Sequence, residues 1–104
     1  MVAYSAEQLA RCRARAIREG LKLRTTPDPL RYRATSSKAP AGPYVYDQAV
    51  STDLASATCT CAATACCDHG GAAVCAARLA RAHQAARDLR RHQLWQRQLA
   101  AIAA

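Results

Sequence analysis

A short cysteine-rich stretch constrains this chain more than any other feature. Five of its six cysteines and one of its three histidines lie between Cys59 and Cys75, in the sequence CTCAATACCDHGGAAVC. If Cys59 and Cys61 lie on a strand, they project to the same face with Cα atoms about 6.6–6.8 Å apart. That separation is near the upper limit for a disulfide. It suits two thiolates on a tetrahedral zinc ion, whose sulfurs lie about 3.8 Å apart.

Cys67 and His69 repeat the two-residue spacing where a loop is expected to turn into a helix. Together the two pairs supply three thiolates and one imidazole. Such a set closes a tetrahedral Cys₃His zinc site and leaves no position for a catalytic water, so the site would be structural. Cys66 directly precedes Cys67 and is the other candidate for the third ligand. We prefer Cys67 because it preserves the CxH spacing.

Two other uses of the cysteines compete with a metal site. A disulfide framework needs an oxidising compartment, and the N-terminal sequence has no apolar signal-peptide core. A reactive thiol needs a neighbouring base or a lowered pKa, and His69 near Cys67 would permit that. A single nucleophile does not explain the CxC pair, however, so both uses are disfavoured. No apolar run is long enough to span a membrane, and we expect a cytoplasmic protein.

The order of these residues resembles the SWIM-type zinc finger, over roughly residues 30–82. The shared features are a CxC pair, a short gap, a CxH pair and a following helix, preceded by Tyr-containing strands at Tyr32–Ser37 and Tyr44–Asp47. The resemblance implies a ββα-like zinc module used for DNA binding or protein contacts. It implies no catalysis. The gap of five residues is at or below the short end of that family's range, and Gly70 and Gly71 stand where its members usually carry apolar residues.

Two helices are predicted, over residues 5–19 and 71–101. Ser5 and Gln8 form a capping-box pattern before the first, and Gly20 is a typical stop. Leu9, Cys12, Ala16 and Ile17 would lie on its buried face. The second helix is rich in good helix formers and has no Pro. We expect its inward stripe at Cys75, Leu79, Ala82, Ala86 and Leu89, and a second stripe at Trp95, Leu99 and Ile102.

Strands are predicted between the helices, in residues 30–70. LRYRATSS alternates apolar and polar residues, as does YVYDQAV, in which Val45 would lie on one face and Tyr44 and Tyr46 on the other. ATCTC would be a short third strand. The 104 residues therefore predict a single α+β domain. It consists of an N-terminal helix, a β-hairpin or three-stranded sheet carrying the zinc, and a long C-terminal helix. The chain contains no Phe, so its core should be weak without the metal.

Charge is unevenly distributed along the chain, whose formal net charge is +8. Residues 1–38 hold nine Lys and Arg against three acids, residues 39–77 hold none against three, and residues 78–104 hold six against one. Two basic flanks suggest contact with a polyanion. The candidate phosphate-contacting residues are Arg11, Arg15, Arg18, Arg78, Arg81, Arg87, Arg90 and Arg91.

We therefore expect a nucleic-acid-binding module, with DNA favoured over RNA. The alternative is a protein–protein adaptor or assembly module in which Trp95, Leu99 and Ile102 pair with a partner or with a second copy of the chain. The sequence shows no paired carboxylates, no Ser/His/Asp set and no glycine-rich phosphate loop. An enzyme is accordingly not expected.

Overall fold

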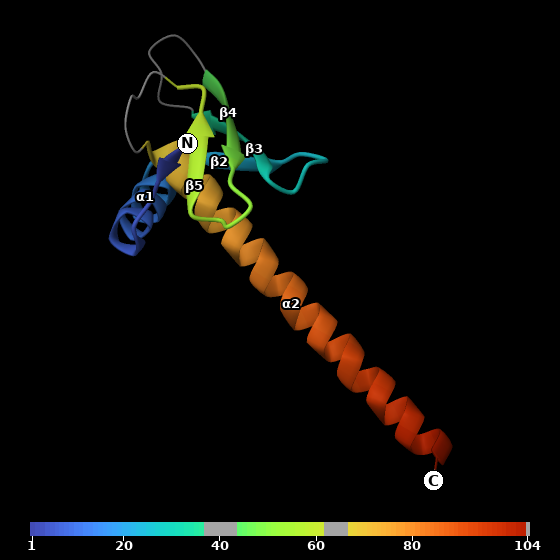
Figure 1. Cartoon of the computed structure of the whole chain (residues 1–104). Helices are drawn as coiled ribbons and strands as arrows, with labels where there is room; N and C mark the ends of the chain where they lie inside the picture. The colour runs from blue at the N-terminus through green and yellow to red at the C-terminus, as the bar shows by residue number, and fades with distance from the viewer. Residues whose placement is uncertain (37–43, 62–66, 104) are drawn as a thin grey trace.

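The structure, a computed structural model, describes residues 1–36, 44–61 and 67–103. In these residues a five-stranded antiparallel sheet with the order β1-β5-β4-β3-β2 lies against the beginning of a long helix, α2. A shorter helix, α1, packs against the same part of α2 (Figure 1). This arrangement confirms the predicted α+β class. No helix in the described parts of the chain is both long and apolar enough to cross a membrane.

Helix α1 spans Ala6–Arg18 and begins as its sequence predicts. The Ser5 hydroxyl accepts a hydrogen bond from the Gln8 amide, and the Gln8 side chain accepts one from the Ser5 amide. This reciprocal pair satisfies two amides that the first helical turn leaves open. The helix ends before Gly20, whose φ of +66° is readily available only to glycine.

The sheet contains the predicted strands and two more. The strands are β1 (Val2–Ala3), β2 (Lys22–Thr25), β3 (Arg31–Ser36), β4 (Tyr44–Val50) and β5 (Ser56–Cys59). The sequence predicts only an extended connection where β2 lies, and its pattern indicates no strand before α1. Both additional strands are at the edges of the sheet, where β1 pairs with β5 and β2 pairs with β3.

Side chains alternate across the central strands in the predicted way. Tyr32 and Ala34 of β3 are buried, as are Gln48 and Val50 of β4. Val45 lies on the opposite, exposed face. Because residues i and i+2 of a strand share a face, one side of the sheet is turned toward the helices and carries the core.

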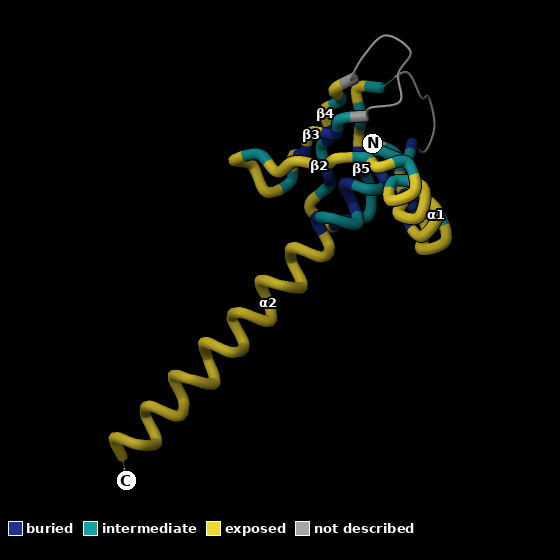
Figure 2. Tube along the Cα trace, turned by 180° about the vertical axis from the view of Figure 1, so that it is seen from behind, coloured by how far each residue is buried: buried dark blue, intermediate teal, exposed yellow. Residues whose placement is uncertain are grey.

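Helix α2 spans Asp68–Ala103 and therefore begins three residues before the predicted start at Gly71. Its buried apolar residues are Ala73, Val74 and Ala77. From residue 78 to residue 103 the helix is exposed all round and projects away from the sheet (Figure 2). The molecule is consequently elongated, with extents of 67 × 26 × 23 Å.

The predicted inward stripe on α2 is wrong. Leu79 and Leu89 are exposed, because the helix has already left the sheet at residue 78. Cys75 is partly buried beside the core and its thiol contacts the Leu9 carbonyl at 3.7 Å. On α1, Leu9 and Cys12 are buried as expected, but Ile17 is 70% exposed, since it lines an open groove between the two helices.

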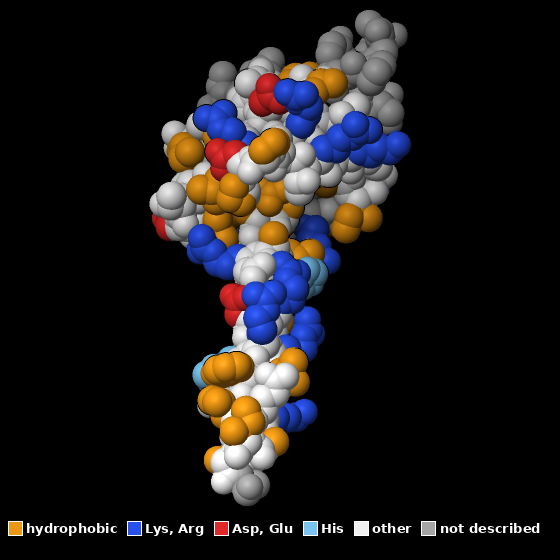
Figure 3. Space-filling view, turned by 90° about the vertical axis from the view of Figure 1, so that its right-hand side faces the viewer, with side chains coloured by type: hydrophobic (Ala, Val, Ile, Leu, Met, Phe, Trp, Pro, Cys, Tyr) orange, Lys and Arg blue, Asp and Glu red, His pale blue; other side chains and the backbone are white. Residues whose placement is uncertain are grey.

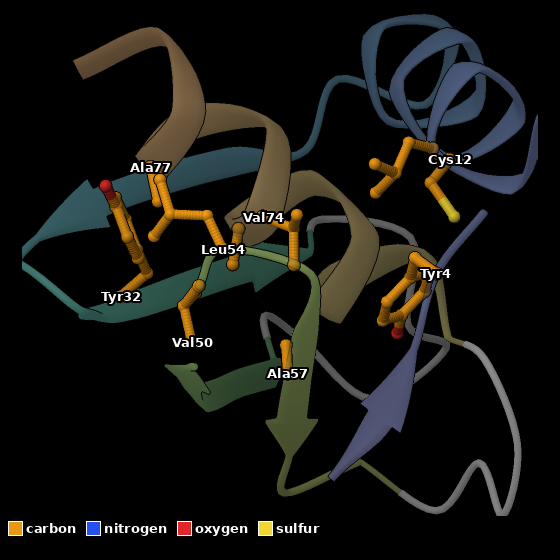
Figure 4. Packing of buried hydrophobic residues seen from close by; sticks show 10 residues of the cluster. Tyr4, Cys12, Tyr32, Val50, Leu54, Ala57, Val74 and Ala77 are labelled. Carbon is orange, nitrogen blue, oxygen red and sulfur yellow. The ribbon is translucent and has the colours of Figure 1, made fainter. Parts of the chain in front are cut away.

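The core has two ends, which Figure 4 shows together. At one end Tyr32 lies near Leu54 and Ala77, and at the other Tyr4 and Cys12 lie beside the first turns of α2. Apart from the two tyrosines, its members are mostly small or medium-sized side chains. Such a core contributes little buried apolar area per residue, as expected of a chain without Phe.

Candidate metal centre

Cys59, Cys61, Cys67 and His69 lie together in the structure. One potential ligand atom from each residue lies within 4.8 Å of all the others. Cys59 ends β5 and Cys61 follows two residues later, while Cys67 directly precedes α2 and His69 lies in its first turn. The sheet and the helix thus contribute one pair each. The cluster could hold a metal ion, and all four predicted ligands are in it.

Cys67 lies in an environment that favours a thiolate. Burial by itself raises the pKa of this thiol, but interactions with the His69 side chain, the Gly70 amide and the thiols of Cys61 and Cys59 together outweigh it and lower the pKa to about 6. The Gly70 amide donates to the Cys67 sulfur at 3.2 Å. Backbone amides at the beginning of a helix are well placed to stabilise negative charge, so the position of Cys67 suits a metal-binding sulfur.

Cys59 lies beside a buried amide side chain. The Nε2 atom of Gln48 donates to the Cys59 sulfur at 3.4 Å and to the Tyr46 carbonyl at 2.9 Å. Burial raises the pKa of the Cys59 thiol to about 11. A bound cation would reverse that preference, since a coordinating thiol is deprotonated by the metal.

His69 provides an independent test of whether the cluster fits a metal. Its Nδ1 atom is buried and has no hydrogen-bond partner among the described residues. An unpaired buried ring nitrogen is costly, and a metal ion coordinated through it would remove that cost. The imidazole ring lies against Tyr46, with ring centroids 4.9 Å apart. The aromatic contact restricts the orientation of the ring.

Cys12 and Cys75 are not among the four clustered residues. Cys12 is buried between α1 and the beginning of α2, and burial raises the pKa of its thiol to about 11. This placement confirms the prediction that Cys12 belongs to the core. Cys66, the alternative third ligand, lies outside the described residues.

Several of the arginines predicted to contact phosphate already bind groups of the chain itself. Arg15 forms ion pairs with Glu19 and with Asp68 at the beginning of α2. Arg78 donates to the Leu54 carbonyl at 2.7 Å. Arg81 donates to the Thr52 carbonyl, and Arg87 donates to the side-chain oxygen of Gln84. Arg11, Arg18, Arg90 and Arg91 are exposed.

The predicted partner-binding residues lie on the projecting part of α2, residues 78–103. Trp95, Leu99 and Ile102 are 58%, 46% and 81% exposed. Figure 3 shows apolar and basic side chains interleaved along this part of the helix. The structure therefore places the apolar candidates and five of the eight basic candidates on α2, while the other three basic candidates lie on α1.

Tyr4 is a residue of the site that the sequence analysis missed. Its hydroxyl contacts both backbone polar groups of Cys67. Burial and the neighbouring Cys67 raise the pKa of Tyr4 above its usual range, so the hydroxyl remains protonated. A signal was present: Tyr4 precedes the capping residue Ser5 and lies five residues before Leu9, the spacing of a hydrophobic staple, and both side chains are in the core.

Comparison with protein-family models, with curated proteins and with solved structures finds no match for this chain. The metal-binding interpretation therefore depends on the geometry of the four side chains and on the spacing of their residues.

Proposed function

We propose that this chain is a small structural zinc module, similar to the SWIM type, that uses its exposed helix to bind another macromolecule. The observation that carries the zinc assignment is the convergence of Cys59, Cys61, Cys67 and His69 within 4.8 Å. Three thiolates and one imidazole suit zinc, which prefers sulfur and nitrogen ligands in a tetrahedral set. With four protein ligands the metal keeps no open position, which supports a structural role over an enzymatic one.

Zinc would supply much of the stability of this fold. Structural zinc binding contributes about 10–16 kcal/mol of apparent free energy at neutral pH, whereas a whole domain has a net stability of about 5–15 kcal/mol. The core is built mainly from small side chains, so the metal is needed to hold α2 against β5. A reducing compartment such as the cytoplasm would keep the cysteines available for it.

Metal analysis tests the zinc assignment. Purified protein should hold one equivalent of zinc, and cobalt substitution should give the thiolate charge-transfer and tetrahedral ligand-field bands. Single changes of each of the four ligands to Ala should abolish tight binding. The matched controls Cys12→Ala and Cys75→Ala should retain the metal. A protein that stays folded and metal-free in EDTA would rule out the proposal.

For the binding partner, the exposed apolar face of α2 favours a protein. Large exposed apolar side chains that gather on one element mark an interaction site more often than scattered ones do. Trp95, Leu99 and Ile102 follow a spacing of four and three residues, so they share one helical face. Changing Trp95 and Leu99 together to Ala should convert an oligomer to a monomer, measured as mass in solution, without loss of zinc. A wild-type chain that is monomeric at high concentration and recruits no protein would contradict this role.

Nucleic acid is the second candidate partner, and the net charge of +8 favours it. Exposed arginines on a rigid helix would contact phosphates, which position a protein on DNA without specifying sequence. An anisotropy titration with duplex DNA, single-stranded DNA and RNA at about 50–100 mM salt, where phosphate contacts are strong, tests this. If none of the three binds at micromolar protein, the protein-partner role remains.

A further inference from the structure

The hydroxyl of Tyr4 connects the N-terminal strand with the metal cluster. Tyr4 is 7% exposed and lies 63 positions before Cys67 in the sequence. Its hydroxyl donates to the Cys67 carbonyl at 2.9 Å and accepts from the Cys67 amide at 3.2 Å. The Tyr4 side chain thus binds both the amide and the carbonyl group of Cys67, which is a candidate metal ligand. The direction in which the Cys67 sulfur points depends on that backbone.

The space for this hydroxyl exists because residue 70 is glycine. A Cβ atom added to Gly70 would lie 2.5 Å from the Tyr4 hydroxyl oxygen, well inside van der Waals contact. The Gly70 amide also donates to the Cys67 sulfur. Gly70 therefore has two roles at this ligand: its amide contacts the sulfur, and its missing side chain leaves room for Tyr4.

Such contacts commonly determine how well a metal is held. Groups that do not touch a metal but orient its ligands typically change its affinity about 10- to 100-fold when they are removed. Tyr4 fits this description because it contacts the backbone of Cys67 and is fixed by its own burial between β5 and α2. Its neighbour Cys12 makes only a long contact of 4.0 Å to the same carbonyl.

We propose that Tyr4 is a positioning residue of the metal centre, whose hydroxyl fixes the Cys67 backbone in the conformation that directs the sulfur to the metal. The proposal rests on the zinc site proposed above. It makes β1 and the residue that follows it part of the metal centre. It also explains why glycine occupies position 70, where the similar zinc fingers usually carry an apolar residue.

The experiment compares Tyr4→Phe with Tyr32→Phe in the full-length chain. Tyr32 is the matched control because it is also a buried tyrosine, at the opposite end of the core (Figure 4). Zinc affinity is measured by competition with a chromophoric chelator, and ligand geometry by the ligand-field bands of the cobalt form. Tyr4→Phe should weaken zinc binding about 10- to 100-fold and shift the cobalt bands. Tyr32→Phe should change neither.

Gly70→Ala tests the same contact from the other side. Ala is the better helix former, so a local effect on α2 would preserve or strengthen zinc binding. If the added methyl group displaces the Tyr4 hydroxyl, zinc binding should weaken instead. In the double variant Tyr4→Phe/Gly70→Ala the hydroxyl is gone, so the zinc affinity should be no lower than in Tyr4→Phe alone.

Three outcomes would overturn these expectations. If Tyr4→Phe keeps the zinc affinity and the cobalt spectrum of the unsubstituted chain, Tyr4 does not position the ligand, even if thermal stability falls. If Gly70→Ala weakens binding equally with and without the hydroxyl, the contact between the two residues is not the cause. If the unsubstituted chain binds no zinc or cobalt, the proposed metal site itself is wrong, and that result is distinct from the first two.

Discussion

The close approach of α1 to α2 can be tested at Gly71. A Cβ atom added there would lie 2.5 Å from the Cys12 Cβ atom and 3.2 Å from the Tyr4 ring. Carbon atoms in contact are normally about 3.5–4.0 Å apart. Because the Cβ atom of Cys12 is fixed to the backbone of α1, rotation of a side chain cannot relieve the overlap. The two helices would have to separate by roughly 1 Å.

Two opposing effects decide the result of Gly71→Ala. Overpacking of a core typically costs about 1–3 kcal/mol. Ala in place of Gly inside a helix contributes about 1 kcal/mol in the other direction. We expect the overlap to dominate, with a net loss of about 1 kcal/mol. For a domain of this size such a loss lowers the melting temperature by about 4–8 °C.

Thermal unfolding of the zinc-saturated protein, followed by circular dichroism, measures this effect. A double-mutant cycle identifies its source. Cys12→Ala removes the sulfur, which also overlaps the added methyl group, but keeps the Cβ atom, so it should relieve only part of the cost of Gly71→Ala. Cys12→Gly removes the Cβ atom as well and should relieve most of it. A melting temperature that rises in Gly71→Ala, as helix propensity alone predicts, would refute the packing argument.

Two further predictions concern the third ligand and the basic residues. Cys66→Ser should leave zinc stoichiometry and melting temperature nearly unchanged; if it loses the metal while Cys67→Ser keeps it, the CxH assignment is wrong. If both basic flanks contact DNA, the logarithm of the affinity should fall with the logarithm of salt concentration with a slope of roughly −4 to −5, for about four to six phosphate contacts. Changing Arg87, Arg90 and Arg91 of α2 to Glu should then reduce DNA affinity more than changing Arg11, Arg15 and Arg18 of α1 to Glu. Equal losses of affinity would contradict the prediction that α2 makes the stronger DNA contacts.

Features with a local physical cause could be predicted from the sequence. The capping box at Ser5 and Gln8 needs only residues within one helical turn, and it forms as expected. The alternation in β3 and β4 indicates which side chains face the core. The Cys and His pairs could be recognised because the ligand spacing of a zinc site is itself a short sequence pattern.

Features that depend on distant partners could not be predicted in the same way. The two-residue strand β1 is too short to show any period, and it exists because β5 offers an edge to pair with. Helix α2 was expected to bury a stripe that includes Leu79, yet an Ala-rich helix shows no clear apolar face. The contact from Tyr4 to Cys67 spans 63 positions, and no motif marks it beyond the staple spacing with Leu9.

The projecting part of α2, residues 78–103, is exposed all round, and near its beginning Arg78 and Arg81 donate hydrogen bonds to the Leu54 and Thr52 carbonyls. Starting a helix is the costly step, because several residues must be fixed for the first hydrogen bond, whereas each further residue adds at little cost. In this chain the first turn contains His69 and follows Cys67 directly, so a bound zinc ion would fix the residues that start the helix. Removal of zinc should therefore reduce the helicity of residues 78–103, although none of them is a metal ligand. Far-ultraviolet circular dichroism of the chelated protein measures this, and undiminished helicity would show that residues 78–103 form their helix without the metal centre.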